Sequence, residues 1–159
     1  MDLYMLRHGA AVQREDWTDD EAIRPLIASG VEEIERVAQL FAKLGVAFDV
    51  ILSSPLARAY QTAEIVADRL NLRDRLVREP VLSPDAFGPR RLPKLLRSHP
   101  EAMAVLMVGH EPSLGETISY LAGGRIILKK GGLALVRVAR DSLDKGALEW
   151  LLQSNVMGL

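Results

Sequence analysis

Residues 49–70, DVILSSPLARAYQTAEIVADRL, place a short apolar run directly before a segment of helical character. Asp49 to Leu52 is typical of a buried strand, and Ser53-Ser54-Pro55 opens a helix that we expect to end at about Leu70. Proline is common in the first turn of a helix, because its missing N–H would have no partner there in any case. A strand that leads straight into a helix is the repeating unit of α/β proteins, so this stretch predicts a parallel sheet covered by helices.

The same alternation continues on both sides of this segment. Upstream, Leu3 to Leu6 predicts a first strand, and Ser29 with Glu32 forms a capping box for a helix that Gly45 ends. Downstream, the pattern predicts a short strand within 76–82, a helix at 89–98, a strand at 104–108, a helix at 112–122, and strands at 126–128, 133–138 and 148–152. Lys129 to Gly132 predicts a hairpin turn. We expect one α/β domain over residues 1–159, with a largely parallel sheet and helices on both faces.

The composition excludes several classes of protein. The 159 residues are 48% hydrophobic and carry a formal net charge of −1, so no global field favours nucleic acid or an anionic membrane as a partner. The absence of cysteine excludes disulfides, thiolate catalysis and cysteine-ligated zinc. No secretory signal and no apolar stretch of membrane-spanning length is visible, so we expect a cytoplasmic protein.

Charge is nevertheless uneven along the chain. Residues 13–36 form an acidic run, whereas residues 69–97 carry eight bases: Arg69, Arg73, Arg75, Arg78, Arg90, Arg91, Lys94 and Arg97. Solvated surface is the simplest interpretation of both runs. The alternative is a basic rim beside a site for an anionic substrate.

Three polar clusters follow three of the predicted strands. Arg7-His8-Gly9 ends the first, Ser53-Ser54-Pro55 ends the second and places Arg58 in the next helix, and Gly109-His110-Glu111 follows the strand at 104–108. In open α/β sheets, ligands bind at the carboxyl edge of the strands. We therefore expect these clusters to converge at one site.

Two histidines and two arginines suit phosphoryl transfer. A guanidinium matches phosphate oxygens in a bidentate manner, and two of them offset the charge of a phosphoryl group. A neutral imidazole is a competent nucleophile on phosphorus when its other ring nitrogen donates to a carbonyl group. Because arginines would repel a divalent cation, we expect no metal at this site. We expect no other cofactor either.

The quoted motifs also resemble a known family. Leu6-Arg7-His8-Gly9, the segment from Ser53 to Thr62, and Val108-Gly109-His110-Glu111-Pro112 are similar, in this order, to three motifs of the histidine phosphatase superfamily. The resemblance runs from residue 3 to about residue 120. It implies a fold like that of phosphoglycerate mutase, and the short length and Arg24-Pro25-Leu26 resemble its small SixA-type phosphohistidine phosphatases.

The resemblance implies a role for each site residue. His8 would accept the phosphoryl group as a covalent phosphohistidine, while Arg7, Arg58 and His110 would hold the phosphoryl oxygens. For the proton donor we favour Glu111, which directly follows the second histidine, with Asp85 as the alternative. A third alternative is that no donor is needed, because the phosphorus–nitrogen bond of a phosphohistidine is labile. Glu111 could instead be an acid favoured by a helix dipole, and Asp85 could be an ordinary turn residue.

The implied substrate is phosphohistidine on a signalling protein, for example a histidine phosphotransfer domain. Residues 71–103 form a short segment between the second and third motifs, and a short segment there suggests a cleft open to a protein surface. A small-metabolite phosphomonoesterase is the first alternative. A non-catalytic module that binds phosphorylated proteins is the alternative from another class.

Overall fold

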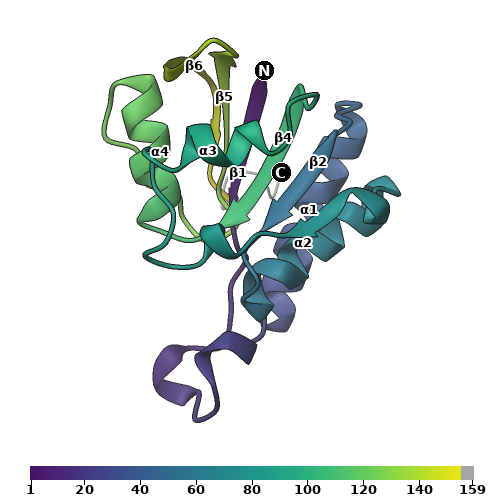
Figure 1. Cartoon of the computed structure of the whole chain (residues 1–159). Coiled ribbons are helices and arrows are strands. Elements are labelled where there is room, and N and C mark those ends of the chain that lie inside the picture. Colours follow the sequence, from purple (N-terminus) through teal and green to yellow (C-terminus); the bar gives the residue numbers. More distant parts are fainter. Residues whose placement is uncertain (155–159) are drawn as a thin grey trace.

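The computed structural model describes residues 1–154 and contains a six-stranded sheet in the order β3-β2-β4-β1-β5-β6 (Figure 1). The strands are β1 (Asp2–Arg7), β2 (Val50–Ser53), β3 (Leu76–Arg78), β4 (Ala104–Gly109), β5 (Leu133–Ala139) and β6 (Ser142–Leu152). Strands β3, β2, β4 and β1 pair in parallel, whereas β5 and β6 are antiparallel additions beyond β1. The predicted α/β class and the largely parallel sheet are confirmed.

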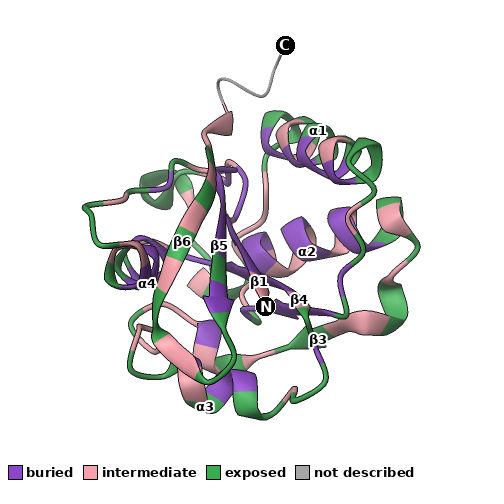
Figure 2. Cartoon of the chain, turned by 90° about the horizontal axis from the view of Figure 1, so that it is seen from above, coloured by how far each residue is buried: buried purple, intermediate pink, exposed green. Residues whose placement is uncertain are grey.

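Helices cover both faces of this sheet, as predicted. Helices α1 (Ala28–Lys43) and α2 (Ala57–Leu70) pack on one face, and α3 (Leu92–Arg97) and α4 (Ser113–Ala122) pack on the other. Alternate residues of β1 supply the two cores: Leu3 and Met5 join α3 and α4, while Tyr4 and Leu6 join α1 and α2. Figure 2 shows the buried side of each helix turned toward the sheet.

Short 3-10 helices lie in the connections, at Arg14–Asp16, Glu21–Ile23, Arg73–Arg75 and Pro80–Leu82. The first two belong to residues 10–27, which extend as an arm beyond the carboxyl ends of the strands (Figure 1). A single bridge between Ala11 and Leu26 closes the base of this arm. No helix within residues 1–154 is long and apolar enough to cross a bilayer.

The predicted capping box at Ser29 is wrong. Helix α1 begins at Ala28, so Ser29 and Glu32 lie inside it, and the N-cap residue Ile27 makes no side-chain cap. A tertiary contact sets this end instead: Ile27 N–H donates to the Ala10 carbonyl, and a Cβ on Gly30 would lie only 2.0 Å from the Ala10 oxygen. The helix start is therefore fixed by close packing against the loop after β1.

Two further predictions fail near residue 130. Residues 126–128 form no strand, and side chains accept hydrogen bonds from their backbone. Ile126 N–H donates to Ser119 Oγ, and Leu128 N–H donates to a carboxylate oxygen of Glu111. Residues 129–132 form a turn, with Gly132 N–H donating to the Lys129 carbonyl, but this turn precedes β5 instead of joining two paired strands. The hairpin of the sheet joins β5 to β6 across residues 140–141.

Candidate active site

The register of the sheet brings the predicted clusters together. Arg7 pairs with Gly109 across β1 and β4, and Ser53 pairs with Val108 across β2 and β4. The next residues therefore leave the sheet side by side, and the imidazole centroids of His8 and His110 lie 5.1 Å apart. The expected convergence of three distant segments at one carboxyl edge is confirmed.

The backbone after β1 sets the orientation of His8. Its Nδ1 lies 2.8 Å from the Gly9 carbonyl oxygen, which can only accept, so the proton of the neutral ring belongs on Nδ1 and the lone pair on Nε2. The Gly9 N–H donates to Thr62 Oγ1 at 3.1 Å, which ties this turn to α2. A Cβ on Gly9 would lie 2.8 Å from Ile34, so the glycine allows α1 to approach.

Burial keeps both imidazoles neutral. Desolvation lowers the pKa of His8 to about 3, and the nearby positive charges of Arg58 and Arg7 act in the same direction. Desolvation, followed by the same two guanidiniums, also lowers the pKa of His110 to about 3. The Nε2 atom of His110 lies 2.8 Å from Ser54 Oγ, so the residue after β2 orients the second ring.

Arg7 and Arg58 enter the site from different elements. Arg7, at the end of β1, donates through one terminal nitrogen to the Leu128 carbonyl at 2.8 Å. Arg58, in the first turn of α2, contacts both the backbone oxygen and the carboxylate of Glu21, at 3.2 and 3.1 Å. Among the described residues, the buried Nε of each arginine has no hydrogen-bond partner. An unpaired buried donor costs roughly 1–3 kcal/mol, a cost that an oxyanion would relieve if it bonded to these Nε groups.

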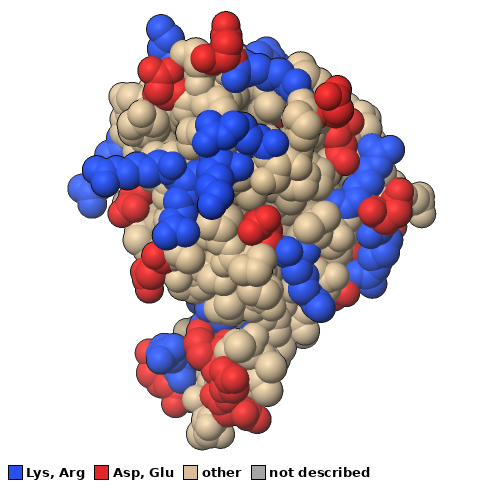
Figure 3. Space-filling view, in the orientation of Figure 1, with Lys and Arg blue, Asp and Glu red and all other residues tan. Residues whose placement is uncertain are grey.

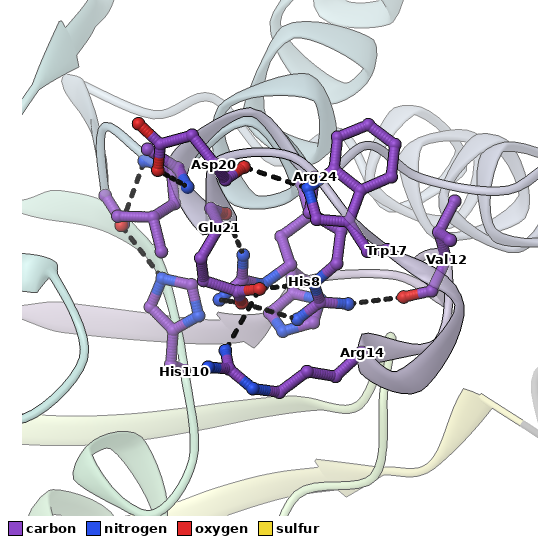
Figure 4. Close-up of polar contacts among 12 residues, drawn as sticks. His8, Val12, Arg14, Trp17, Asp20, Glu21, Arg24 and His110 are labelled. Carbon is purple, nitrogen blue, oxygen red and sulfur yellow. Dashed lines mark hydrogen bonds and ion pairs between the residues drawn. The ribbon is translucent and has the colours of Figure 1, made fainter.

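The arm contributes charged side chains to the site that the sequence did not predict. Figure 4 shows Glu21, Arg24 and Arg14 reaching from residues 10–27 toward the two histidines. The Glu21 carboxylate contacts Arg24 at 2.8 Å and Arg14 at 3.1 Å, and these guanidiniums together with that of Arg58 lower its pKa to about 2. The sequence did carry a signal for a role of Arg14 and Arg24, because they are the only cations between residues 10 and 27.

The two candidate proton donors lie in different surroundings. One carboxylate oxygen of Glu111 accepts from Leu128 N–H at 2.9 Å. Burial raises the pKa of Glu111, and this hydrogen bond and then the charge of Arg7 oppose that rise. Asp85 is exposed, in a turn that Ala86 N–H closes onto the Ser83 carbonyl, with φ at +62°. Glu111 and Arg7 therefore bond to the two sides of the same residue, Leu128: Glu111 to its N–H and Arg7 to its carbonyl. Asp85 lies on the surface, after the 3-10 helix Pro80–Leu82.

Comparisons with known proteins agree with this geometry. The sequence model of the histidine phosphatase superfamily (branch 1) matches residues 3–83. An uncharacterized protein of Picosynechococcus is 40% identical over 86% of this chain and 85% of its own length. The phosphohistidine phosphatase SixA of Escherichia coli is 30% identical, over 94% of this chain and 92% of its own. A solved structure of the protein histidine phosphatase SixA complexed with tungstate superposes with a TM-score of 0.87, at 24% identity, over 99% of both chains.

Proposed function

Because the chain belongs to the histidine phosphatase superfamily and is a phosphatase, we propose that it is a cytoplasmic enzyme that hydrolyses phosphohistidine on a protein. The reaction passes through a covalent intermediate on His8. One observation carries the proposal: the contact of His8 Nδ1 with the Gly9 carbonyl at 2.8 Å leaves a lone pair on Nε2. This atom belongs to a ring beside a second buried imidazole, within electrostatic range of two guanidiniums.

In the first step, the lone pair of His8 Nε2 attacks phosphorus. The bond from phosphorus to the leaving nitrogen or oxygen breaks, and its electron pair stays on the leaving atom, which then takes a proton. Arg7, Arg58 and His110 bind the phosphoryl oxygens, and their donors stabilise the negative charge of the transition state. The depressed pKa of His8 keeps the nucleophile unprotonated at neutral pH.

In the second step, a water molecule attacks the same phosphorus in line with the P–Nε2 bond. That bond breaks, its electron pair returns to Nε2, and the water loses a proton to solvent or to the group that protonated the leaving atom. Inorganic phosphate leaves, and His8 regains its neutral ring with the proton on Nδ1. The Gly9 carbonyl holds the same Nδ1 proton throughout, so the ring needs no reorientation between the steps.

Glu111 is the proton donor in this scheme, and Asp85 is the alternative. Support for Glu111 comes from its burial, which raises its pKa and favours the protonated form, and from its link to the Arg7 contact through Leu128. Loss of a donor slows substrates with poor leaving groups more than those with good ones. Glu111→Gln and Asp85→Asn should be compared on an alkyl phosphate and on 4-nitrophenyl phosphate, and the variant that slows only the alkyl phosphate identifies the donor.

The basic run supports a protein as substrate. Arg73 pairs with Glu64 and Asp68, Arg75 donates to the Phe48 carbonyl, and Arg78 stacks over a tyrosine ring, so these cations are engaged within the fold. In contrast, Arg90, Arg91, Lys94 and Arg97 form no hydrogen bond or ion pair through their side chains within residues 1–154. Arg69 also makes no such contact among the described residues, so three of the eight cations are engaged within the fold and five are free.

Three of the free cations lie around a groove on the α3 face. Arg90, Arg91 and Lys94 line a hollow of about 490 Å³ together with Glu79 and Val81, and we call it the basic groove. Figure 3 shows Lys and Arg side chains gathered over α3. Glu79, in the lining of the groove, donates its N–H to the Ser53 carbonyl at 2.7 Å. The next residue, Ser54, contacts His110, so the groove adjoins the site. An acidic face on a phosphoprotein would complement this groove.

A substrate comparison tests the proposal. The catalytic efficiency should be higher on a phosphohistidine protein than on sugar phosphates, nucleotides and other small phosphoesters. The triple variant R90E/R91E/K94E should slow the phosphoprotein by at least roughly tenfold and leave 4-nitrophenyl phosphate unchanged. R36E/K43E/R69E is the matched control, because these exposed cations lie on α1 and α2, on the opposite face of the sheet.

Other results would contradict the proposal in distinct ways. Higher efficiency on a small phosphoester would identify a metabolite phosphatase, and phosphate binding without turnover would identify a binding module. Equal slowing of both substrates by R90E/R91E/K94E would exclude the basic groove as a docking surface.

A further inference from the structure

The Glu21 carboxylate is held by three guanidiniums. Its Oε1 lies 2.8 Å from Arg24 and 3.1 Å from Arg58, and its Oε2 lies 2.9 Å from Arg24 and 3.1 Å from Arg14. An oxyanion surrounded by arginine N–H groups is the arrangement expected around a phosphoryl group. In this structure, a side chain of the protein itself fills that role.

This carboxylate contacts one of the residues that we propose to bind the phosphoryl group, Arg58. The charge of Glu21 raises the pKa of His110, against the larger lowering by burial. Figure 4 shows Glu21 pointing from the arm toward the side of the site that holds His8 and His110. While this Arg58 N–H group bonds to Glu21, it cannot form an equally strong hydrogen bond to a phosphoryl oxygen.

We propose that the Glu21 carboxylate competes with the phosphoryl group for the guanidiniums of Arg58 and Arg24. The phosphoryl group displaces the carboxylate from both arginines when it binds. The inference rests on the proposed function, because it concerns the same phosphoryl site. It also assigns Arg24 to the substrate-binding residues, since displacement of Glu21 releases two of its N–H donors toward the phosphoryl oxygens.

The remaining contacts of the arm allow this exchange without unfolding. Arg58 also donates to the backbone carbonyl of Glu21, and Arg24 donates to the carbonyl of Val12, so both arginines keep an anchor when the carboxylate leaves. The Glu21 side chain is one-third exposed, so rotation about its own bonds carries the carboxylate into solvent. The exchange replaces a singly charged oxyanion by a doubly charged one, which arginines bind more strongly.

Removal of the competitor should tighten the binding of an oxyanion. A bound state that must first displace an internal contact has a weaker apparent affinity, so Glu21→Gln should bind tungstate roughly tenfold more tightly than the unmodified protein. Arg24→Gln should bind tungstate several-fold more weakly. Calorimetric titration of the full chain with tungstate, at pH 7 and constant salt, measures both effects.

Glu15→Gln is the matched control for charge. Glu15 is exposed in the same arm, and within the described residues it makes no ion pair with an arginine. Removal of its charge should leave tungstate affinity within about twofold, because solvent and salt screen an exposed charge that makes no ion pair. Trp17 donates its indole N–H to the Asp20 carbonyl, so its fluorescence in a Trp150→Phe background reports whether the arm keeps its fold in each variant.

The outcomes separate this inference from the proposed function, because tungstate binding needs no turnover. If Glu21→Gln binds tungstate with equal or lower affinity, Glu21 orients Arg58 instead of competing, and the inference is wrong while the phosphatase site stands. If Glu15→Gln tightens binding as much as Glu21→Gln, the effect is one of general charge, and the inference is again wrong. If neither the unmodified protein nor Glu21→Gln binds tungstate, the phosphoryl site itself is wrong, and the proposed function fails with it.

Discussion

The carboxyl edge of the sheet and the arm of residues 10–27 both bring arginines to the histidines, but by different means. At the edge, the pairing of Arg7 with Gly109 and of Ser53 with Val108 fixes the side chains through the register of buried strands. In the arm, one carboxylate, that of Glu21, holds Arg14, Arg24 and Arg58 at once. The edge is built by the fold, whereas the arm depends on ionic contacts that a substrate can replace.

The largest difference should appear between Arg58, which α2 anchors beside the edge although Glu21 contacts it, and Arg24, which belongs to the arm, when each is replaced by lysine. Arg58→Lys loses the planar fork beside His8 and should lower kcat/KM by roughly a hundredfold or more, as for other donors to a transition-state oxyanion. Arg24→Lys should cost at most about tenfold, because Arg58 and Arg7 are retained. Steady-state kinetics on one aryl phosphate measures both, and equal losses would show that the arm is as essential as the edge.

The two regions should also respond to acid in different pH ranges. The folded-state pKa values of His8 and His110, about 3, lie below the ordinary value of 6.5, so the unfolded chain takes up these protons first. Stability should therefore fall below pH 6.5, by at most about 1.4 kcal/mol per pH unit for each imidazole. The contribution of Glu21, with its pKa lowered from 4.5 to about 2, should be lost only below about pH 4.5.

Chemical denaturation at a series of pH values between 7 and 5 tests this separation. The double variant His8→Asn/His110→Asn should show a nearly flat free energy of unfolding over that range, and Glu21→Gln should keep the slope of the unmodified protein. A flat profile in the unmodified protein would mean that the imidazoles are not held neutral by burial.

A smaller effect is expected where the two regions meet. Gly30 of α1 packs against Ala10 at the base of the arm, and a Cβ there would approach the Ala10 oxygen to 2.0 Å. Gly30→Ala should therefore lower the free energy of unfolding by roughly 1–3 kcal/mol, despite the better helix propensity of alanine. Gly124→Ala, where a Cβ meets nothing within 4 Å, should be nearly neutral in the same denaturation assay. A stabilised Gly30→Ala would show that the contact is loose.

The sequence predicts the residues at the carboxyl edge of the sheet but not those of the arm. Arg7, His8, Arg58 and His110 could be placed because each lies within a few residues of a strand whose apolar run is clear, and parallel strands end at one edge. Glu21 could not be placed, since nothing local fixes the path of an irregular arm. The failures at Ser29 and at residues 126–128 share this cause, because long-range contacts with Ala10 and Glu111 replace the local structure that the pattern favours.

The attachment point of the phosphoryl group on the trapped enzyme tests the central claim most directly. The enzyme should be phosphorylated by a phosphohistidine protein, denatured at alkaline pH, and studied by phosphorus–nitrogen correlation in NMR, with His8→Ala as the control. We expect one acid-labile phosphoryl group, bonded to Nε2 of His8 and absent from the variant. Phosphorus on Nδ1, on His110, or on no histidine at all would contradict the account.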